Sequence, residues 1–190
     1  MTAAEPSSRA VRYPGGLQAH YRWVGSGQAA ALFALTETGG PLHDHGPLAG
    51  REPDALCRAE LRVEGPAATW TACLASPIFD EPDAVLWDTA ALLVVRYGFI
   101  GYGFAVRSGD LAWHVTAGTP LIAVLGSSRL DHVLLQGEVE TFAVRPDGSI
   151  AWRLAHDDVV AEAALVAGRL VLTSFTGRTS ALDPATGRAT

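Results

Sequence analysis

The chain has 190 residues, enough for one large domain or two small ones, and its 48% hydrophobic and 18% charged residues exclude a disordered chain. The net charge is −6 at pH 7, and the 14 basic residues, all arginine, are spread along the chain. This pattern argues against nucleic acid as a partner, since such proteins carry a basic stripe. Without lysine the chain also has no Schiff-base or phosphate-loop lysine.

The first 15 residues are small and polar, and we expect residues 1–15 to be a flexible N-terminal segment. They lack the apolar core of a secretory signal, so the expected compartment is the cytoplasm. No apolar run approaches the roughly 20 residues that cross a bilayer, so we expect no membrane partner. Residues 16–190 are predicted to form one repeat domain.

The next part of the chain matches the later repeats only weakly. Residues 30–43 carry a Phe-Ala-Leu strand pattern and a Gly turn, with His43 where a Trp stands elsewhere. The segment 44–76 is divergent, and we expect it to be a degenerate blade that contains a hairpin of strands 59–64 and 68–74. Cys57 and Cys73 flank this hairpin, and we expect buried, reduced thiols rather than a disulfide.

From residue 84 onward the chain repeats itself. Phe104-Ala-Val-Arg-Ser-Gly-Asp-Leu-Ala-Trp113 returns as Phe142-Ala-Val-Arg-Pro-Asp-Gly-Ser-Ile-Ala-Trp152, and a third copy, residues 180–188, stops before its Trp. Short β-branched or apolar runs precede and follow each turn, and these predict strands at 84–87, 91–96, 101–106, 111–115, 121–125, 131–136, 138–144, 149–154 and 159–166. Four short antiparallel strands in roughly 40 residues are typical of a β-propeller blade.

The repeated pattern resembles that of the PQQ-like, or quinoprotein-type, β-propellers. It is carried by residues 99–113, 137–152 and 177–188, and more weakly by 30–43. The resemblance implies an all-β fold, a small or partial β-propeller of four to five blades. It also implies that Trp113 and Trp152 pack between blades, which a large aromatic at a fixed place in each repeat suggests by itself. Phe104 and Phe142 recur in the same way and are expected to be structural.

A quinone-dependent dehydrogenase is excluded within this resemblance. The family's enzymes use a vicinal cysteine pair and a calcium site that contains Asn, in a much longer chain. Here Cys57 and Cys73 are far apart in the sequence and Asn is absent. We therefore expect no cofactor.

The incomplete third copy would leave a sheet edge open, which native proteins rarely tolerate. Residues 16–23 have the Gly-x-x-Ala-aromatic spacing of the missing piece. We therefore expect this N-terminal strand to pair with residues 179–182 and close the ring, either within one chain or between two chains of a dimer.

Few residues suggest chemistry. His43 and His45 would share a face of a strand and are weak metal candidates, with a third ligand needed from Glu52, Asp54 or His20. His156 beside Asp157 resembles an acid/base pair, although neighbouring loop residues usually point apart into solvent. His114 and His132 do not recur between repeats and are expected to be packed or solvated.

The sequence favours a non-catalytic binding or scaffolding module for a protein partner or a second copy of the chain. One alternative is a small-molecule or sugar binder that uses the aromatic rings of Tyr97, Phe99 and Tyr102. Another is a hydrolase or lyase with His and Asp residues in its loops. Convergence of His43, His45, His156 and Asp157 on one mouth of the ring would favour an enzyme or a metal site.

Overall fold

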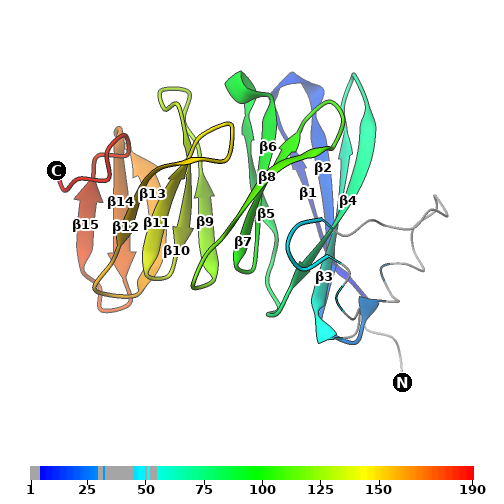
Figure 1. The fold of residues 1–190 in the computed structure, drawn as a ribbon, viewed down its shortest axis with the longest axis horizontal. Coiled ribbons are helices and arrows are strands. Elements are labelled where there is room, and N and C mark those ends of the chain that lie inside the picture. Colours follow the sequence, from blue (N-terminus) through cyan, green and yellow to red (C-terminus); the bar gives the residue numbers. More distant parts are fainter. Residues whose placement is uncertain (1–4, 30–31, 33–44, 50, 52–54) are drawn as a thin grey trace. The chain divides into compact units, whose positions relative to one another are not determined.

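The protein is built almost entirely of β-strands in a computed structural model that describes residues 5–29, 32, 45–49, 51 and 55–190 (Figure 1). These residues form four antiparallel sheets of four, four, four and three strands. Sheet A contains β1 (Ser7–Arg12), β2 (Gln18–Val24), β3 (Cys57–Glu64) and β4 (Thr69–Ser76). Sheet B contains β5 (Asp83–Trp87), β6 (Leu92–Tyr97), β7 (Ile100–Ala105) and β8 (Leu111–Thr116).

The other two sheets follow in chain order. Sheet C contains β9 (Leu121–Leu125), β10 (Val133–Gly137), β11 (Glu140–Val144) and β12 (Ile150–Ala155). Sheet D contains β13 (Val160–Val166), β14 (Arg169–Ser174) and β15 (Thr179–Leu182). The only helical segments in the described part of the chain are two short 3-10 turns, Pro14–Gly16 and Asp88–Ala90. None of the described helices is long and apolar enough to cross a membrane.

Contacts divide the chain into two compact units. Unit 1 comprises residues 1–82 together with the turn 105–111, and unit 2 comprises residues 83–104 and 112–190. Sheet A therefore belongs to unit 1, whereas sheets C and D lie wholly in unit 2.

The all-β fold and its antiparallel strands are confirmed. The strands predicted between residues 84 and 166 are all present, with ends that shift by at most a few residues. The predicted hairpin of the divergent segment also forms, as β3 and β4, with Leu61 opposite Ala72. It is the second half of sheet A rather than a degenerate blade of its own. The weak repeat with His43 falls mostly outside the described residues.

The expected closure by the N-terminal strand is wrong. β2, which contains most of segment 16–23, pairs with β1 on one edge and β3 on the other, so neither edge is open to β15. Ala19, Tyr21 and Trp23 alternate along β2 and are all buried, because this apolar face belongs to the core of sheet A. The spacing that resembled the missing repeat strand reflects this alternation.

Each end of the described chain instead pairs with a strand close to it in the sequence. Residues 7–12, inside the segment that we expected to be flexible, form β1 in register with β2 from Ser7 opposite Trp23 to Arg12 opposite Gln18. At the C-terminus, Leu182 of β15 bridges Ala189, and the Thr190 amide donates to the Ala181 carbonyl at 3.0 Å. The chain therefore returns along the edge of β15 with its own last residues.

Sheet A packs its apolar side chains on one face. Leu61 and Val63 of β3 lie opposite Ala72 and Trp70 of β4, and all four are buried. Cys57 and Cys73 are buried side chains of the same two strands, opposite Ser76 and Glu60 respectively. Cys57 therefore shares the face of Leu61, whereas Cys73 lies on the opposite face of the sheet, beside Glu60.

Sheet C is buried on both of its faces. One cluster of buried residues joins sheets B and C, and it includes Trp113, Leu135 and Phe142. A second cluster joins sheets C and D, and it includes Leu134 and Leu172. Because β10 and β11 lie between two layers, they are buried along their whole length, including the polar side chains of Gln136, Glu140 and Thr141.

A tryptophan of one hairpin packs on a turn glycine that comes later in the chain, and this happens three times. Gly109, Gly148 and Gly187 all have positive φ, and a Cβ atom on any of them would lie within 2.6 to 2.7 Å of an atom of Trp70, Trp113 and Trp152, respectively. These positions need glycine for the left-handed backbone and for the contact itself. The Trp–Gly stack is therefore the recurring contact between one repeat and the next.

Sequence reasoning placed His43, not Trp70, at the start of this series. The Gly-to-Trp spacing before Trp70 is one residue longer than in the later repeats, and the Phe-Ala-Val strand does not precede it. Trp70 is nonetheless only 8% exposed and stacks on Gly109, so it is the first member of the series.

Candidate functional site

The aromatic residues proposed as a ligand surface lie mostly inside the protein. Tyr97 and Tyr102 are fully buried, and Tyr102 stacks on Phe104 with ring centroids 6.0 Å apart. Phe99 is half-buried in the turn between β6 and β7. The sequence could not show this, because a strand pattern does not tell which of its side chains are buried.

The four residues whose convergence would favour an enzyme do not gather in one compact unit. His43 lies outside the described residues, His45 belongs to unit 1, and His156 and Asp157 belong to unit 2. The described residues contain no group of three or more His, Cys, Asp or Glu side chains that could hold a metal ion. Of the proposed third ligands, Glu52 and Asp54 are also outside the described residues.

The other singled-out histidines differ in burial. His114 is exposed on β8. His132 is buried just before β10, where Nδ1 lies 2.8 Å from Asp131 Oδ1 and Nε2 lies 2.8 Å from the Pro184 carbonyl. Its ring meets Trp152 edge-on at 6.2 Å. His132 therefore joins the loop before β10 to the last turn of sheet D, and this contact is structural.

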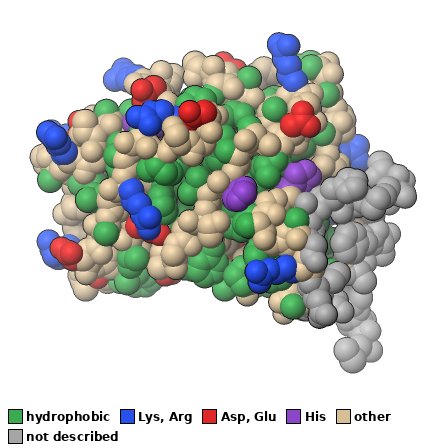
Figure 2. All heavy atoms as spheres, viewed as in Figure 1, with side chains coloured by type: hydrophobic (Ala, Val, Ile, Leu, Met, Phe, Trp, Pro, Cys, Tyr) green, Lys and Arg blue, Asp and Glu red, His purple; other side chains and the backbone are tan. Residues whose placement is uncertain are grey.

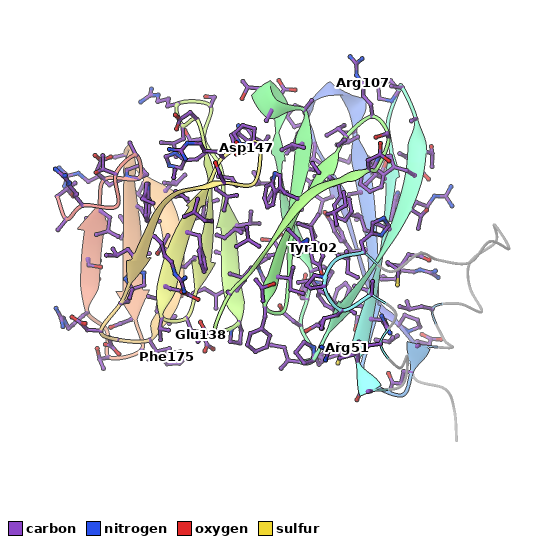
Figure 3. The ribbon with its side chains drawn as sticks, in the orientation of Figure 1. Arg51, Tyr102, Arg107, Glu138, Asp147 and Phe175 are labelled. Carbon is purple, nitrogen blue, oxygen red and sulfur yellow. The ribbon has the colours of Figure 1, made fainter. Side chains whose placement is uncertain are left out.

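One end of sheets C and D brings together polar and exposed apolar side chains. We call it the C–D rim, and it consists of the loop 156–159 between β12 and β13 and the turn 175–178 between β14 and β15. Figure 3 places Phe175 and Glu138 at this end of the hairpins and Asp147 at the opposite end. The His156 amide donates to the Val139 carbonyl at 2.8 Å, and the Val160 amide donates to the Glu138 carbonyl at 2.7 Å. These bonds fix the loop against the turn between β10 and β11.

The turn 175–178 is held to the loop by its own hydrogen bonds. The Phe175 amide donates to the Val159 carbonyl at 2.9 Å. The Thr176 hydroxyl donates to Asp158 Oδ2, while the Val159 amide donates to Asp158 Oδ1 at 2.8 Å. The hydrogen bond from Thr176 is the largest of the causes that lower the pKa of Asp158 below its ordinary range. Asp158 is thus an ionised anchor of the turn.

The rim exposes two apolar side chains beside this anchor. Phe175 is 75% exposed and Val159 is 36% exposed. Next to them is a cavity of about 190 Å³. It is lined by Ala155, His156, Asp157, Asp158, Val160, Leu172, Ser174, Arg178 and Ser180.

His156 begins a chain of buried hydrogen bonds that runs into sheet C. Its Nε2 lies 2.7 Å from Thr141 Oγ1, and that hydroxyl donates to Gln136 Oε1 at 2.6 Å. Because the hydroxyl proton goes to Gln136, Nε2 must donate to Thr141. Burial is the main cause that lowers the pKa of His156, against the opposing effect of Asp157 and Glu140.

This geometry is poor for acid/base chemistry. Nε2 donates to Thr141, so Nδ1 is the proton-accepting atom of the imidazole. Within the described residues, however, no hydrogen bond joins His156 to Asp157 or Asp158, so neither carboxylate orients the ring. Both oxygens of Asp158 accept hydrogen bonds that shape the loop. A general base needs a proton-accepting atom within reach of its substrate and a partner that orients it. The rim instead has the features of a rigid surface.

Charged side chains are dispersed on the face of the molecule that Figure 2 shows. Arginine and acidic side chains alternate there with apolar ones rather than forming one block. A nucleic-acid site would show a continuous basic stripe.

Comparison with known proteins identifies similar folds but no family. No protein-family model and no curated protein matches the chain. Among solved structures, BamB from Moraxella catarrhalis is 15% identical with a TM-score of 0.56, over 98% of this chain and 50% of that one. Saccharomyces cerevisiae Sqt1 is 9% identical with a TM-score of 0.56, over 100% of this chain and 58% of that one.

A third similar structure is HIRA(644–1017), 13% identical with a TM-score of 0.51, over 96% of this chain and 51% of that one. The fold is that of a β-propeller. The chain spans about half the length of the structures that it matches. At these identities the likeness concerns the fold alone, and the use of the fold must be argued from its surface.

Proposed function

We propose that this β-propeller chain is a non-catalytic binding module that presents the C–D rim to a protein partner. The observation that carries the proposal is Phe175, a 75% exposed aromatic ring on a turn whose backbone and side chains are hydrogen-bonded to the neighbouring loop. A fixed, exposed aromatic side chain surrounded by polar groups is typical of a binding hot spot.

The size of the cavity favours a protein over a small molecule or a sugar. Its volume of about 190 Å³ is below that of sites for drug-sized ligands, which occupy roughly 300–1,000 Å³. It is large enough for one side chain of a partner, and Arg178, Asp157 and His156 on its lining would orient a polar group.

We also infer that the repeat is of the PQQ-like type. Support comes from the recurring Phe-Ala-Val strand, the glycine turn and the terminal Trp. The stacking of Trp113 on Gly148 and of Trp152 on Gly187 gives this pattern a structural reason.

Site-specific photo-crosslinking tests the proposed rim. A photoreactive phenylalanine analogue at position 175, in the full chain in its native cells, should give one dominant crosslinked protein. The same analogue at Ile150, which is 41% exposed and lies outside the rim, is the matched control. The variant Phe175→Ala should lose binding of the purified partner by at least roughly tenfold, as expected for a hot-spot residue. Equal crosslinking at both positions, or none at 175, would contradict the proposal.

A further inference from the structure

Sheet D has one covered face and one open face. Leu170 and Leu172 of β14 and Leu182 of β15 point toward sheet C and are buried. Successive side chains of a strand point to opposite faces, so the residues between them form the other face. We call it the outer face of sheet D. Its members are Glu162, Ala164, Val166, Arg169, Val171, Thr173, Thr179 and Ala181.

The centre of the outer face is a row of small apolar side chains. Ala164, Val171 and Ala181 lie opposite one another in the register of the three strands. Ala164 is exposed, and Val171 and Ala181 are partly exposed. Beside this row, Val166 is 53% exposed.

The corresponding row in sheet C is covered by another sheet and can be compared with this one. Leu134 and Ala143 are opposite each other there, as Val171 and Ala181 are in sheet D. Both are fully buried, because they pack against sheet D. The outer face of sheet D thus has the composition of a sheet-to-sheet contact, and the described residues leave it exposed.

Opposite charges stand at the two ends of the outer face. Glu162 lies in the row with Thr173 and Thr179 on one side of the apolar row, and Arg169 lies opposite Val166 on the other side. A two-fold axis along the apolar row would place Val171 of one copy on the same row of a second copy. It would also bring Glu162 of each copy to the end that carries Arg169 of the other. This is the self-complementary arrangement that an isologous dimer requires.

We propose that the outer face of sheet D binds the same face of a second copy of this chain. The proposal concerns a different surface from the C–D rim and does not depend on it.

The dimer should be weak. The three strands have seven, six and four residues. At about 3.3 Å per residue and about 4.8 Å between strands, they cover on the order of 300 Å² per copy. A standard interface uses about 800 Å² per partner. We therefore expect a dissociation constant in the micromolar range or weaker, visible as a rise in mass with concentration.

Sedimentation equilibrium of the full chain over roughly 5 to 500 μM tests this directly, in a range chosen for a micromolar dissociation constant. Ala181→Arg places a charged side chain in the apolar row and should abolish the concentration dependence. Glu162→Arg and Arg169→Glu should each weaken association about tenfold or more, and the double variant should restore it, as a reciprocal charge pair requires. Arg129→Glu makes the same charge change at another exposed position of unit 2 and should have no effect.

Circular dichroism of each variant shows that the sheets are intact, so a loss of association is not a loss of folding. A wild-type chain that stays monomeric up to 500 μM would overturn the proposal. A dimer that survives Ala181→Arg, or a double variant that does not recover, would place the contact elsewhere.

Discussion

Trp70 in unit 1 and Trp113 in unit 2 occupy the same place in their repeats, but they differ in the hydrogen bonding of the indole N–H. Trp70 Nε1 donates to the Val106 carbonyl at 2.8 Å. Trp113 is equally buried, at 7% exposed, yet its Nε1 has no hydrogen-bond partner in the described structure. Both rings stack on a glycine of a later turn. The position therefore requires the ring and its contact, and the hydrogen bond is an addition that only Trp70 has.

Removal of the ring should have the largest effect. Trp113→Ala takes away a side chain in contact with Gly103 and Gly148, and we expect a loss of about 3–5 kcal/mol in the free energy of unfolding. Trp152→Ala should cost less, because Trp152 is only partly buried. Urea unfolding monitored by circular dichroism measures both. Equal losses would show that burial of the ring does not set its contribution.

Substitution of the glycine in the Trp–Gly stack should have the next largest effect on the free energy of unfolding. Gly148 and Gly168 both have positive φ, at 84° and 79°, but only Gly148 would place a Cβ against Trp113. Gly168→Ala is thus a matched control that carries the backbone penalty of roughly 1–2 kcal/mol alone. Gly148→Ala should lose a further 1–3 kcal/mol or so through overlap with the ring. Identical unfolding midpoints for the two variants would refute this role of the contact.

Loss of the indole hydrogen bond should lower the free energy of unfolding by less than loss of the whole ring. Trp70→Phe removes the donor to the Val106 carbonyl, while Trp113→Phe removes an indole N–H that has no partner. We expect Trp70→Phe to be more destabilising by about 1 kcal/mol, the usual net value of one hydrogen bond. Thermal and urea unfolding of the pair provide the measurement. A larger loss for Trp113→Phe would reverse the comparison.

The smallest effect concerns His156 in unit 2, whose ring N–H has a hydrogen-bond partner, in contrast to that of Trp113. Burial lowers the pKa of His156 below its ordinary 6.5. Protonation is then easier in the unfolded chain. The stability that comes from the neutral ring is present above pH 6.5 and decreases as the pH falls toward the lowered value.

His156→Gln keeps a donor for Thr141 but cannot titrate. Its unfolding free energy should therefore fall less than that of the wild type between pH 7 and pH 5, a window that brackets the ordinary histidine pKa. The measurement is urea unfolding at several pH values in that window. Parallel pH profiles for the two proteins would contradict the role of His156.

The repeat predicted much of the fold. The Phe-Ala-Val strands, the glycine turns and Trp113 and Trp152 were found from spacing, because each repeat must present the same residue types to its neighbour. Trp70 was missed, since one additional residue before it hides the spacing. The pairing of β2 was also missed, because its alternation of apolar side chains suits any antiparallel neighbour and does not specify which one.

The candidate site was harder to predict than the fold. His156 and Asp157 were predicted as surface residues from the sequence, but Phe175 and Val159 were not. Their exposure depends on the hydrogen bonds between the loop and the turn, which the sequence does not show. Tyr97 and Tyr102 were predicted to lie on a surface, but both are buried. Their strand pattern does not tell whether a second layer covers them, and only the packed sheets do.

The Trp–Gly stacks have a consequence for how the chain opens. The turn 105–111 groups with unit 1, whereas the strands on either side of it group almost entirely with unit 2. The boundary between the two units thus falls inside a sequence repeat, at the turn whose Gly109 stacks on Trp70. Amide hydrogen exchange should accordingly change protection inside sheet B, between the turn and its strands, rather than at the linkers between sheets.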